Sequence, residues 1–186
     1  MRRTFVFDLP DRFVTGTVGE PGQRTFFLQA RDGRRVVSVI LEKTQVAVLA
    51  ERLGRLLLEL DQHGITEEVP IDVDDSPLDE PLNEAFRAGT LTLGWDGEEE
   101  RILIEAREQT DEDQDIEDAI EAVEADDDDE DGPDLFRVRM TANAARSFVE
   151  RAFRVVRSGR PPCPLCGNPL DPAGHICPRK NGAYLH

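Results

Sequence analysis

The chain has 186 residues, a formal net charge of −17 and a mean hydropathy of −0.46. This length suits one domain with a small appendage. No stretch approaches the roughly 20 consecutive apolar residues that cross a bilayer, and the N-terminus has charged residues where a secretory signal has an apolar run. We therefore expect a cytoplasmic protein that does not engage a membrane.

The first half of the chain predicts four strands followed by a helix. β-branched and aromatic runs bounded by turn residues indicate strands at 5–7, 12–18, 25–30 and 36–41. Apolar side chains then recur at three- and four-residue steps from Lys43 to His63, which predicts an amphipathic helix with Thr44 as its N-cap. Residues 65–88 contain three prolines and predict an irregular connection, with at most a short helix near 82–87.

The second half predicts three more strands and a second helix. The strands are expected at 90–95, 101–106 and 135–140, and the helix at about 142–158 with Thr141 as its cap. Residues 108–134 contain 16 acidic side chains and no basic one. Such a run repels itself and cannot build a core, so we expect a disordered acidic insertion at about 109–133 with at most a brief helix at 116–123.

The two halves resemble each other when they are laid side by side. Each has three strands and then a helix, Gly16-Thr17-Val18 aligns with Gly89-Thr90-Leu91, and both helices contain a Glu-Arg pair. Matches this short also arise by chance. The pattern predicts an α+β fold in which an antiparallel sheet carries two helices on one face, and it raises the alternative of a duplicated β-β-β-α unit.

All three cysteines lie near the C-terminus in a pattern typical of a metal site. Cys163 and Cys166 belong to a Cys-Pro-x-Cys-Gly turn. Eight residues separate Cys166 from His175, and Cys177 follows two positions later. A disulfide would leave one thiol over, and a redox motif needs a helix that Gly167 and Pro169 forbid. Mononuclear iron usually takes four cysteines. Three thiolates and one imidazole favour structural zinc, so we divide the chain into a domain at 1–159 and a zinc ribbon-like tail at 160–186.

The C-terminal part is basic although the whole chain is acidic. Residues 137–186 contain nine basic and two acidic side chains. A solvated helix face is the simplest interpretation, and the alternative is a surface for an anion or a partner. The candidate residues for that surface are Arg151, Arg154, Arg157, Arg160, Arg179 and Lys180. In a further alternative, the acidic insertion folds over these residues and competes with an anionic partner.

The glycine-rich loop at 16–24 is the second candidate site. A tight turn between strands is the simplest interpretation, and the alternative is a loop that presents backbone amides to an anion. The loop lacks the strand-loop-helix context and the Lys-Ser/Thr pair of a phosphate-binding loop. No serine or cysteine outside the metal motif lies in a recognisable nucleophile motif, so we favour a protein that is not an enzyme.

Several long stretches together resemble one protein family. They are Phe5–Asp8 with Asp11–Phe13, residues 16–30, the Phe86-Arg87-x-Gly89 step and the tail from Arg160 to Arg179. These stretches are similar to domain-of-unknown-function family 3090 over nearly the whole chain. The resemblance implies a cytoplasmic actinobacterial protein from a family whose members lie near genes for a histidine-phosphatase-like protein and a kinase-like protein. It implies no reaction.

The sequence thus favours a non-enzymatic binding or adaptor protein with structural zinc, whose tail presents a surface to another protein. The first alternative is a nucleic-acid-associated factor that uses the basic second helix and the tail, with the acidic insertion as a modulator. The second alternative is a small-molecule-binding protein or enzyme acting at loop 16–24. Neither the identity of the partner nor the oligomeric state follows from the sequence.

Overall fold

The computed structural model describes residues 1–111, 120–122, 131–159 and 162–168, together with Leu170, His175 and Cys177. The strands are β1 (Thr4–Asp8), β2 (Arg12–Val18), β3 (Thr25–Asp32), β4 (Arg35–Leu41), β5 (Glu84–Asp96), β6 (Arg101–Glu108), β7 (Ile120–Ala122) and β8 (Leu135–Met140). The helices are α1 (Lys43–Gln62) and α2 (Ala142–Arg157). No helix within the described ranges is long and apolar enough to cross a bilayer.

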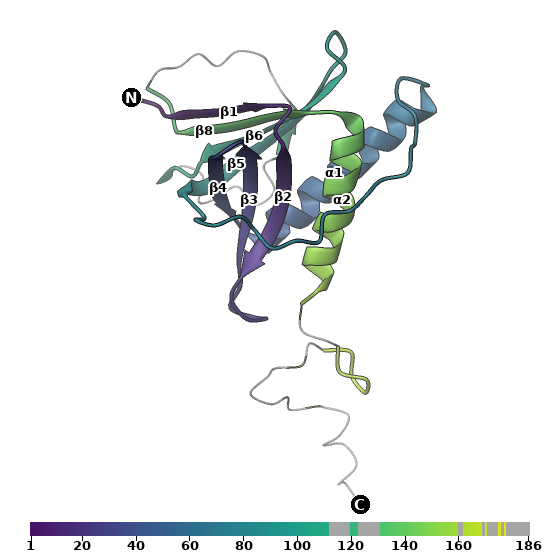
Figure 1. The fold of residues 1–186 in the computed structure, drawn as a ribbon. Coiled ribbons are helices and arrows are strands. Elements are labelled where there is room, and N and C mark those ends of the chain that lie inside the picture. Colours follow the sequence, from purple (N-terminus) through teal and green to yellow (C-terminus); the bar gives the residue numbers. More distant parts are fainter. Residues whose placement is uncertain are drawn as a thin grey trace, which may run out of the picture.

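The strands form one mixed sheet in the order β1-β8-β6-β5-β4-β3-β2, and β7 pairs with β5. Both helices lie on the same side of it (Figure 1). Neighbouring strands are antiparallel within β2-β3-β4 and within β5-β6-β8, whereas the pairs β1–β8, β4–β5 and β5–β7 are parallel. The predicted α+β class with two helices is confirmed, and the sheet is mixed where an antiparallel one was expected. The parallel pairs β4–β5 and β1–β8 arise where the two antiparallel groups meet, and the third, β5–β7, comes from the acidic insertion.

Each antiparallel group is followed by a helix, so the fold repeats one β-β-β-α arrangement. β4 leads into α1, and β8 leads into α2 in the same way. Leu41 and Met140 each directly precede the N-cap of their helix, so they correspond. Following the paired residues from strand to strand then relates Phe26 to Ile102 and Thr17 to Trp95. Gly16 therefore corresponds to Gly94, not to Gly89 as the short sequence match predicts. Strand register is decided by ladder hydrogen bonds and core packing, which a three-residue match does not carry.

The first strand of each repeat spans both antiparallel groups. The N-terminal part of β5 pairs with β4 and its C-terminal part pairs with β6, with a register shift between Ala88 and Leu91. In the first repeat the corresponding segment is interrupted at residues 9–11, where Leu9 has a positive φ of 50°, and it forms β1 and β2. Residues 84–87 are strand and not the short helix expected near 82–87, because they pair with a distant strand.

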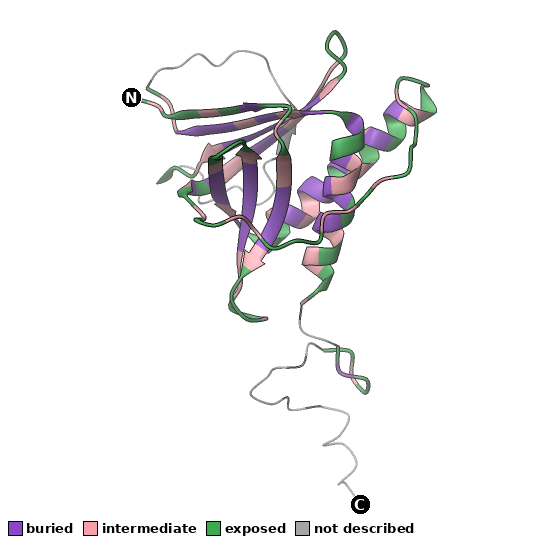
Figure 2. Ribbon diagram, viewed as in Figure 1, coloured by how far each residue is buried: buried purple, intermediate pink, exposed green. Residues whose placement is uncertain are grey.

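The two helices bury side chains at corresponding positions. The N-cap residues are Glu42, which forms a capping box with Gln45, and Thr141, which accepts a hydrogen bond from the Ala144 amide. The predicted N-cap at Thr44 is wrong, because Thr44 is the second residue of α1. Counted from its N-cap, each helix buries side chains at the same positions. They are Val46, Leu49, Ala50 and Leu53 in α1 and Ala145, Phe148, Val149 and Ala152 in α2. Burial of each large member stabilises the fold by roughly 1.5–3 kcal/mol, and both helices share one core with the sheet (Figure 2).

Three residues of the acidic insertion belong to the sheet. Ile120–Ala122 form β7 and pair in parallel with Leu91–Leu93 of β5. They are therefore strand and not part of a helix at 116–123. Residues 112–119 and 123–130 lie outside the described part of the chain, so the expected disorder over 109–133 stays a prediction there. The proposed division at residue 159 also stays a prediction.

Candidate functional site

The first two cysteines lie in a tight knuckle at the start of the tail. The Gly167 amide donates to the Cys163 carbonyl at 2.8 Å, and the Cys163 amide donates to the Asn168 carbonyl at 2.7 Å. Gly167 has a φ of 77°, a left-handed conformation that costs a residue with a Cβ more than it costs glycine. These contacts fold the backbone back so that the side chains of Cys163 and Cys166 converge.

The knuckle meets His175 and Cys177 to form a compact group of four ligands. The Sγ atoms of Cys163 and Cys177 are 3.9 Å apart, and Cys166 Sγ lies 3.2 Å from His175 Nε2. The ligand atoms of all four residues lie within 4.8 Å of one another. Thiolates bound to one tetrahedral zinc at their usual distance lie about 3.8 Å apart. The four residues predicted from the sequence are therefore positioned to bind a metal ion.

Backbone amides in the knuckle prepare one cysteine to bind as a thiolate. Hydrogen bonds from the amides of Cys166 and Leu165 lower the pKa of Cys163 from 9.0 to about 6. The Asn168 amide lowers the pKa of Cys166, but burial and the neighbouring thiols of Cys163 and Cys177 outweigh it and raise that pKa overall. A cation placed among these sulfurs would relieve the repulsion between thiolates, because it supplies the opposite charge.

The arginines that the sequence suggested as an anion or partner surface have different surroundings. Arg151 is buried, and its Nε donates to the Thr15 carbonyl at 2.7 Å. Arg154 is exposed and forms an ion pair with Asp75 at 2.9 Å. The Arg157 guanidinium lies over the Phe153 ring, 5.3 Å from its centroid. The other predicted members lie outside the described residues: they are Arg160, Arg179 and Lys180.

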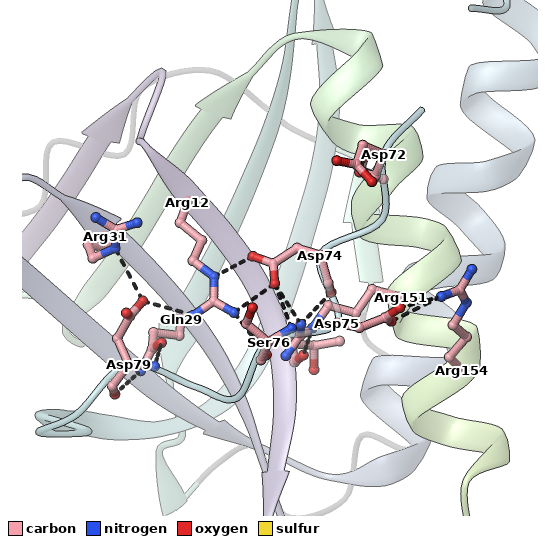
Figure 3. Close-up of polar contacts among 12 residues, drawn as sticks. Arg12, Gln29, Arg31, Asp72, Asp74, Asp75, Ser76, Asp79, Arg151 and Arg154 are labelled. Atoms are coloured by element: carbon pink, nitrogen blue, oxygen red, sulfur yellow. Dashed lines mark hydrogen bonds and ion pairs between the residues drawn. The ribbon is translucent and has the colours of Figure 1, made fainter. Parts of the chain in front are cut away.

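Arg151 belongs to an arginine–aspartate cluster that joins α2 to the segment between α1 and β5 (Figure 3). We call the segment at residues 72–79 the aspartate strap, because three of its aspartates contact arginines. Arg151 Nη1 donates to the backbone carbonyl of Asp74 and lies 3.3 Å from its carboxylate. The Asp74 carboxylate also accepts two hydrogen bonds from Arg12 of β2, at 2.5 and 3.0 Å. One aspartate thus links β2 to α2, the last helix of the fold.

A second aspartate attaches the far end of the strap to the sheet. The Asp79 carboxylate accepts hydrogen bonds from Arg12 at 2.9 Å and from Arg31 of β3 at 3.3 Å. The side-chain amide of the buried Gln29 bonds both the carbonyl and the amide of Asp79. Leu78 packs on Gly16 so closely that a Cβ there would lie 2.7 Å from its side chain. The strap therefore lies directly on β2 and β3.

The charges in this cluster shift one another's protonation. The hydrogen bond from Arg12 lowers the pKa of Asp74, and the same contact raises the pKa of Arg12. Burial lowers the pKa of Arg151, against the attraction of Asp74 that raises it. Sequence reasoning missed this cluster because its members lie far apart in the chain, 48 residues for Arg31 and Asp79 and 77 for Arg151 and Asp74. Its only local signal was a run of aspartates in a segment with three prolines.

Loop 16–24 forms the end of the β2–β3 hairpin. The Gln23 amide donates to the Glu20 carbonyl at 2.9 Å, and Gly19 and Gly22 have positive φ values of 102° and 94°. A Cβ on Gly19 would lie 2.8 Å from the Gln23 carbonyl oxygen, so glycine fits this turn where other residues do not. The glycines therefore serve the backbone of the turn.

With this geometry established, comparison with known proteins places the chain. A family model described as "Protein of unknown function (DUF3090)" matches residues 5–177. The chain belongs to this family. The family suggested by the sequence resemblance is thereby confirmed, and the match ends at Cys177, so it includes all four members of the candidate metal centre. No curated protein and no solved structure matches this DUF3090 chain.

Proposed function

We propose that this DUF3090 protein is a cytoplasmic binding or adaptor protein whose C-terminal segment holds a structural zinc ion and presents a surface to another protein. The observation that carries the proposal is the convergence of the four ligand atoms within 4.8 Å. Three cysteines and one histidine complete a tetrahedral zinc shell without an open position for substrate. Free thiols arranged for a metal also suit a reducing compartment.

Among the described residues of the tail, Leu165 best suits contact with a partner. It lies between the two knuckle cysteines, and 51% of its surface is exposed. A metal-bound turn would hold this apolar side chain in one conformation, which lowers the entropy that a partner loses on binding it. The adaptor proposal also agrees with the arginine contacts, because Arg151 and Arg154 of α2 already engage Asp74 and Asp75. A nucleic-acid surface that used Arg151 and Arg154 would have to break those contacts.

A site-specific cross-linking experiment tests the proposed partner surface. Leu165 is replaced by a photo-crosslinking amino acid in the full chain in cells, and Leu58 of α1, which is 56% exposed, is replaced in a matched control. We expect one defined adduct from position 165, none from position 58, and loss of the adduct when Cys163→Ser is added. The proposal fails if position 165 gives no defined adduct, or if the Cys163→Ser change leaves the adduct intact.

A further inference from the structure

A second site candidate lies next to the β2–β3 hairpin, where the N-terminus of α1 meets the C-terminus of α2. It is a cavity of about 400 Å³. Its apolar wall is formed by Phe26, Val155 and Val156, and Arg24, Lys43 and Arg157 contribute positive charges. The four metal-binding positions do not line it. The cavity is therefore separate from the metal centre, and any role it has does not depend on the proposed function.

The charges of this cavity are unusual in so acidic a protein. None of its described lining residues is aspartate or glutamate. Other arginines of the fold are neutralised, such as Arg12 by Asp74 and Arg87 by Glu42. By contrast, Lys43 and Arg157 form no ion pair with any carboxylate in the described ranges. Positive charges that converge without a counter-ion provide a place for an anion from solution.

Arg24 is held in position and still has a hydrogen-bond donor to offer. Its Nη1 donates to the Ser158 carbonyl at 2.8 Å and to the Ser158 hydroxyl at 3.1 Å. Its Nε is buried and has no hydrogen-bond partner among the residues that the structure describes. Leaving a buried donor unpaired is unfavourable, so an acceptor atom that reaches Nε would be stabilised there. The contact with Ser158 keeps the guanidinium oriented before any ligand arrives.

Lys43 brings a second charge to the same place from the other helix. It is the first residue of α1, whose N-terminal end favours negative charge through the helix dipole. A Cβ on Gly159 would lie 3.5 Å from Lys43 Nζ, so the ammonium group lies against Gly159, two residues beyond the end of α2. Lys43 and Arg157 thus reach the cavity from helices that begin and end beside it.

We propose that this cavity binds a small molecule that carries a phosphate group next to an apolar group. A phosphate monoester is nearly a dianion at neutral pH, and it matches three uncompensated cations better than a single carboxylate does. Arg24 and Arg157 offer planar donors to its oxygens, and Lys43 offers a point charge. The wall of Phe26, Val155 and Val156 then covers the apolar part of the ligand, as in most small-molecule sites.

Calorimetry on the full chain with phenyl phosphate as the probe tests this site. Phenol and inorganic phosphate, the two fragments of the probe, are titrated separately to measure the apolar and the anionic contributions to binding. All titrations use a low-salt buffer without phosphate. We expect saturable binding of phenyl phosphate that is tighter than that of either fragment. Lys43→Gln and Arg157→Gln should each weaken it about tenfold, because a charged hydrogen bond is lost. Arg34→Gln, which removes the same charge from an exposed turn, should leave it unchanged.

Backbone amide NMR of the same titration gives a readout that does not depend on affinity. We expect phenyl phosphate to shift the amides of Gly22 and Gly159, which line the cavity, and to leave Gly97 in the β5–β6 turn unmoved. The proposal is overturned if phenyl phosphate binds no more tightly than phenol, or if the Lys43→Gln/Arg157→Gln double variant binds as the unchanged protein does. It is equally overturned if the shifts appear away from the cavity.

Discussion

Two arginines on α2 that look alike in the sequence have different energetic roles. Arg151 and Arg154 are one helical turn apart, and both contact the aspartate strap. The side chain of Arg151 is 7% exposed and serves backbone carbonyls of β2 and the strap, whereas that of Arg154 is 56% exposed. Loss of a buried donor leaves its acceptors unpaired, while an exposed ion pair is screened by water.

Replacement of Arg151 should therefore destabilise the fold far more than replacement of Arg154. We expect Arg151→Met to lower the free energy of unfolding by about 3 kcal/mol, because Thr15 and Asp74 lose their donor. Arg154→Gln should lower it by less than about 1 kcal/mol. Urea unfolding followed by circular dichroism measures both. Equal effects of the two changes would contradict the structural role of Arg151.

The strap should also make stability depend on pH through Asp74. Arg12 lowers the pKa of Asp74 in the folded protein below the ordinary value of 3.8. This contribution is thus complete above pH 3.8 and is lost as the pH falls toward the folded-state pKa. Asp74→Asn should reduce stability at neutral pH and flatten its decline in acid. Asp72→Asn, at an exposed neighbour, should do neither, and urea unfolding at a series of pH values compares them.

At the scale of elements, the tail with the candidate metal centre is held together differently from the helices. The helices α1 and α2 are held by apolar faces that pack on the sheet and on each other. The knuckle is instead held by the hydrogen bonds of a turn, and the two residues between its cysteines, Pro164 and Leu165, are exposed. So few buried apolar groups cannot order a segment in water, and a metal ion would supply the missing free energy.

Loss of one ligand should therefore affect the tail alone. We expect the purified chain to contain one zinc ion by elemental analysis, and Cys163→Ser to contain much less than one. The far-UV spectrum and the unfolding midpoint should stay nearly unchanged, because the core excludes Cys163. A Cys163→Ser protein that retained stoichiometric zinc would show that the ligand set is wrong.

Metal retention should also depend on pH in a defined direction. Since the metal-free pKa of Cys163 is about 6, protons compete with the metal more strongly as the pH falls below that value. We expect zinc to be released to a chelator faster below about pH 6 than at pH 8. A release rate that did not change across this interval would argue against thiolate ligation by Cys163.

For the whole molecule, the two β-β-β-α repeats share one sheet and one core. β5 pairs with β4 of the first repeat and with β6 of the second. The segment of β1 and β2 makes the equivalent connection between β8 and β3. One core contains side chains from both repeats and both helices, so neither repeat can bury its apolar face alone.

Both repeats should accordingly unfold together. Trp95, the one tryptophan, reports on the second repeat, and far-UV circular dichroism reports on all elements. We expect the two signals to give the same urea midpoint. Leu28→Ala, in the buried part of the first repeat, should lower both midpoints equally and cost about 3 kcal/mol. Two separate transitions would mean that the repeats are independent domains.

Local patterns of the sequence predicted both helices, most of the strands and the metal motif. The helices followed from apolar steps of three and four residues, and the four ligands from cysteine and histidine spacing, because both signals act within a few turns of the chain. The tertiary structure alone decided the start of β5, the parallel contacts and the pairing of Arg12 and Arg151 with Asp74. These depend on segments far apart in the chain, where burial and ladder hydrogen bonds override local preference. The tertiary structure also brings Lys43 and Arg157 to the wall of one cavity, which no spacing in the sequence reveals.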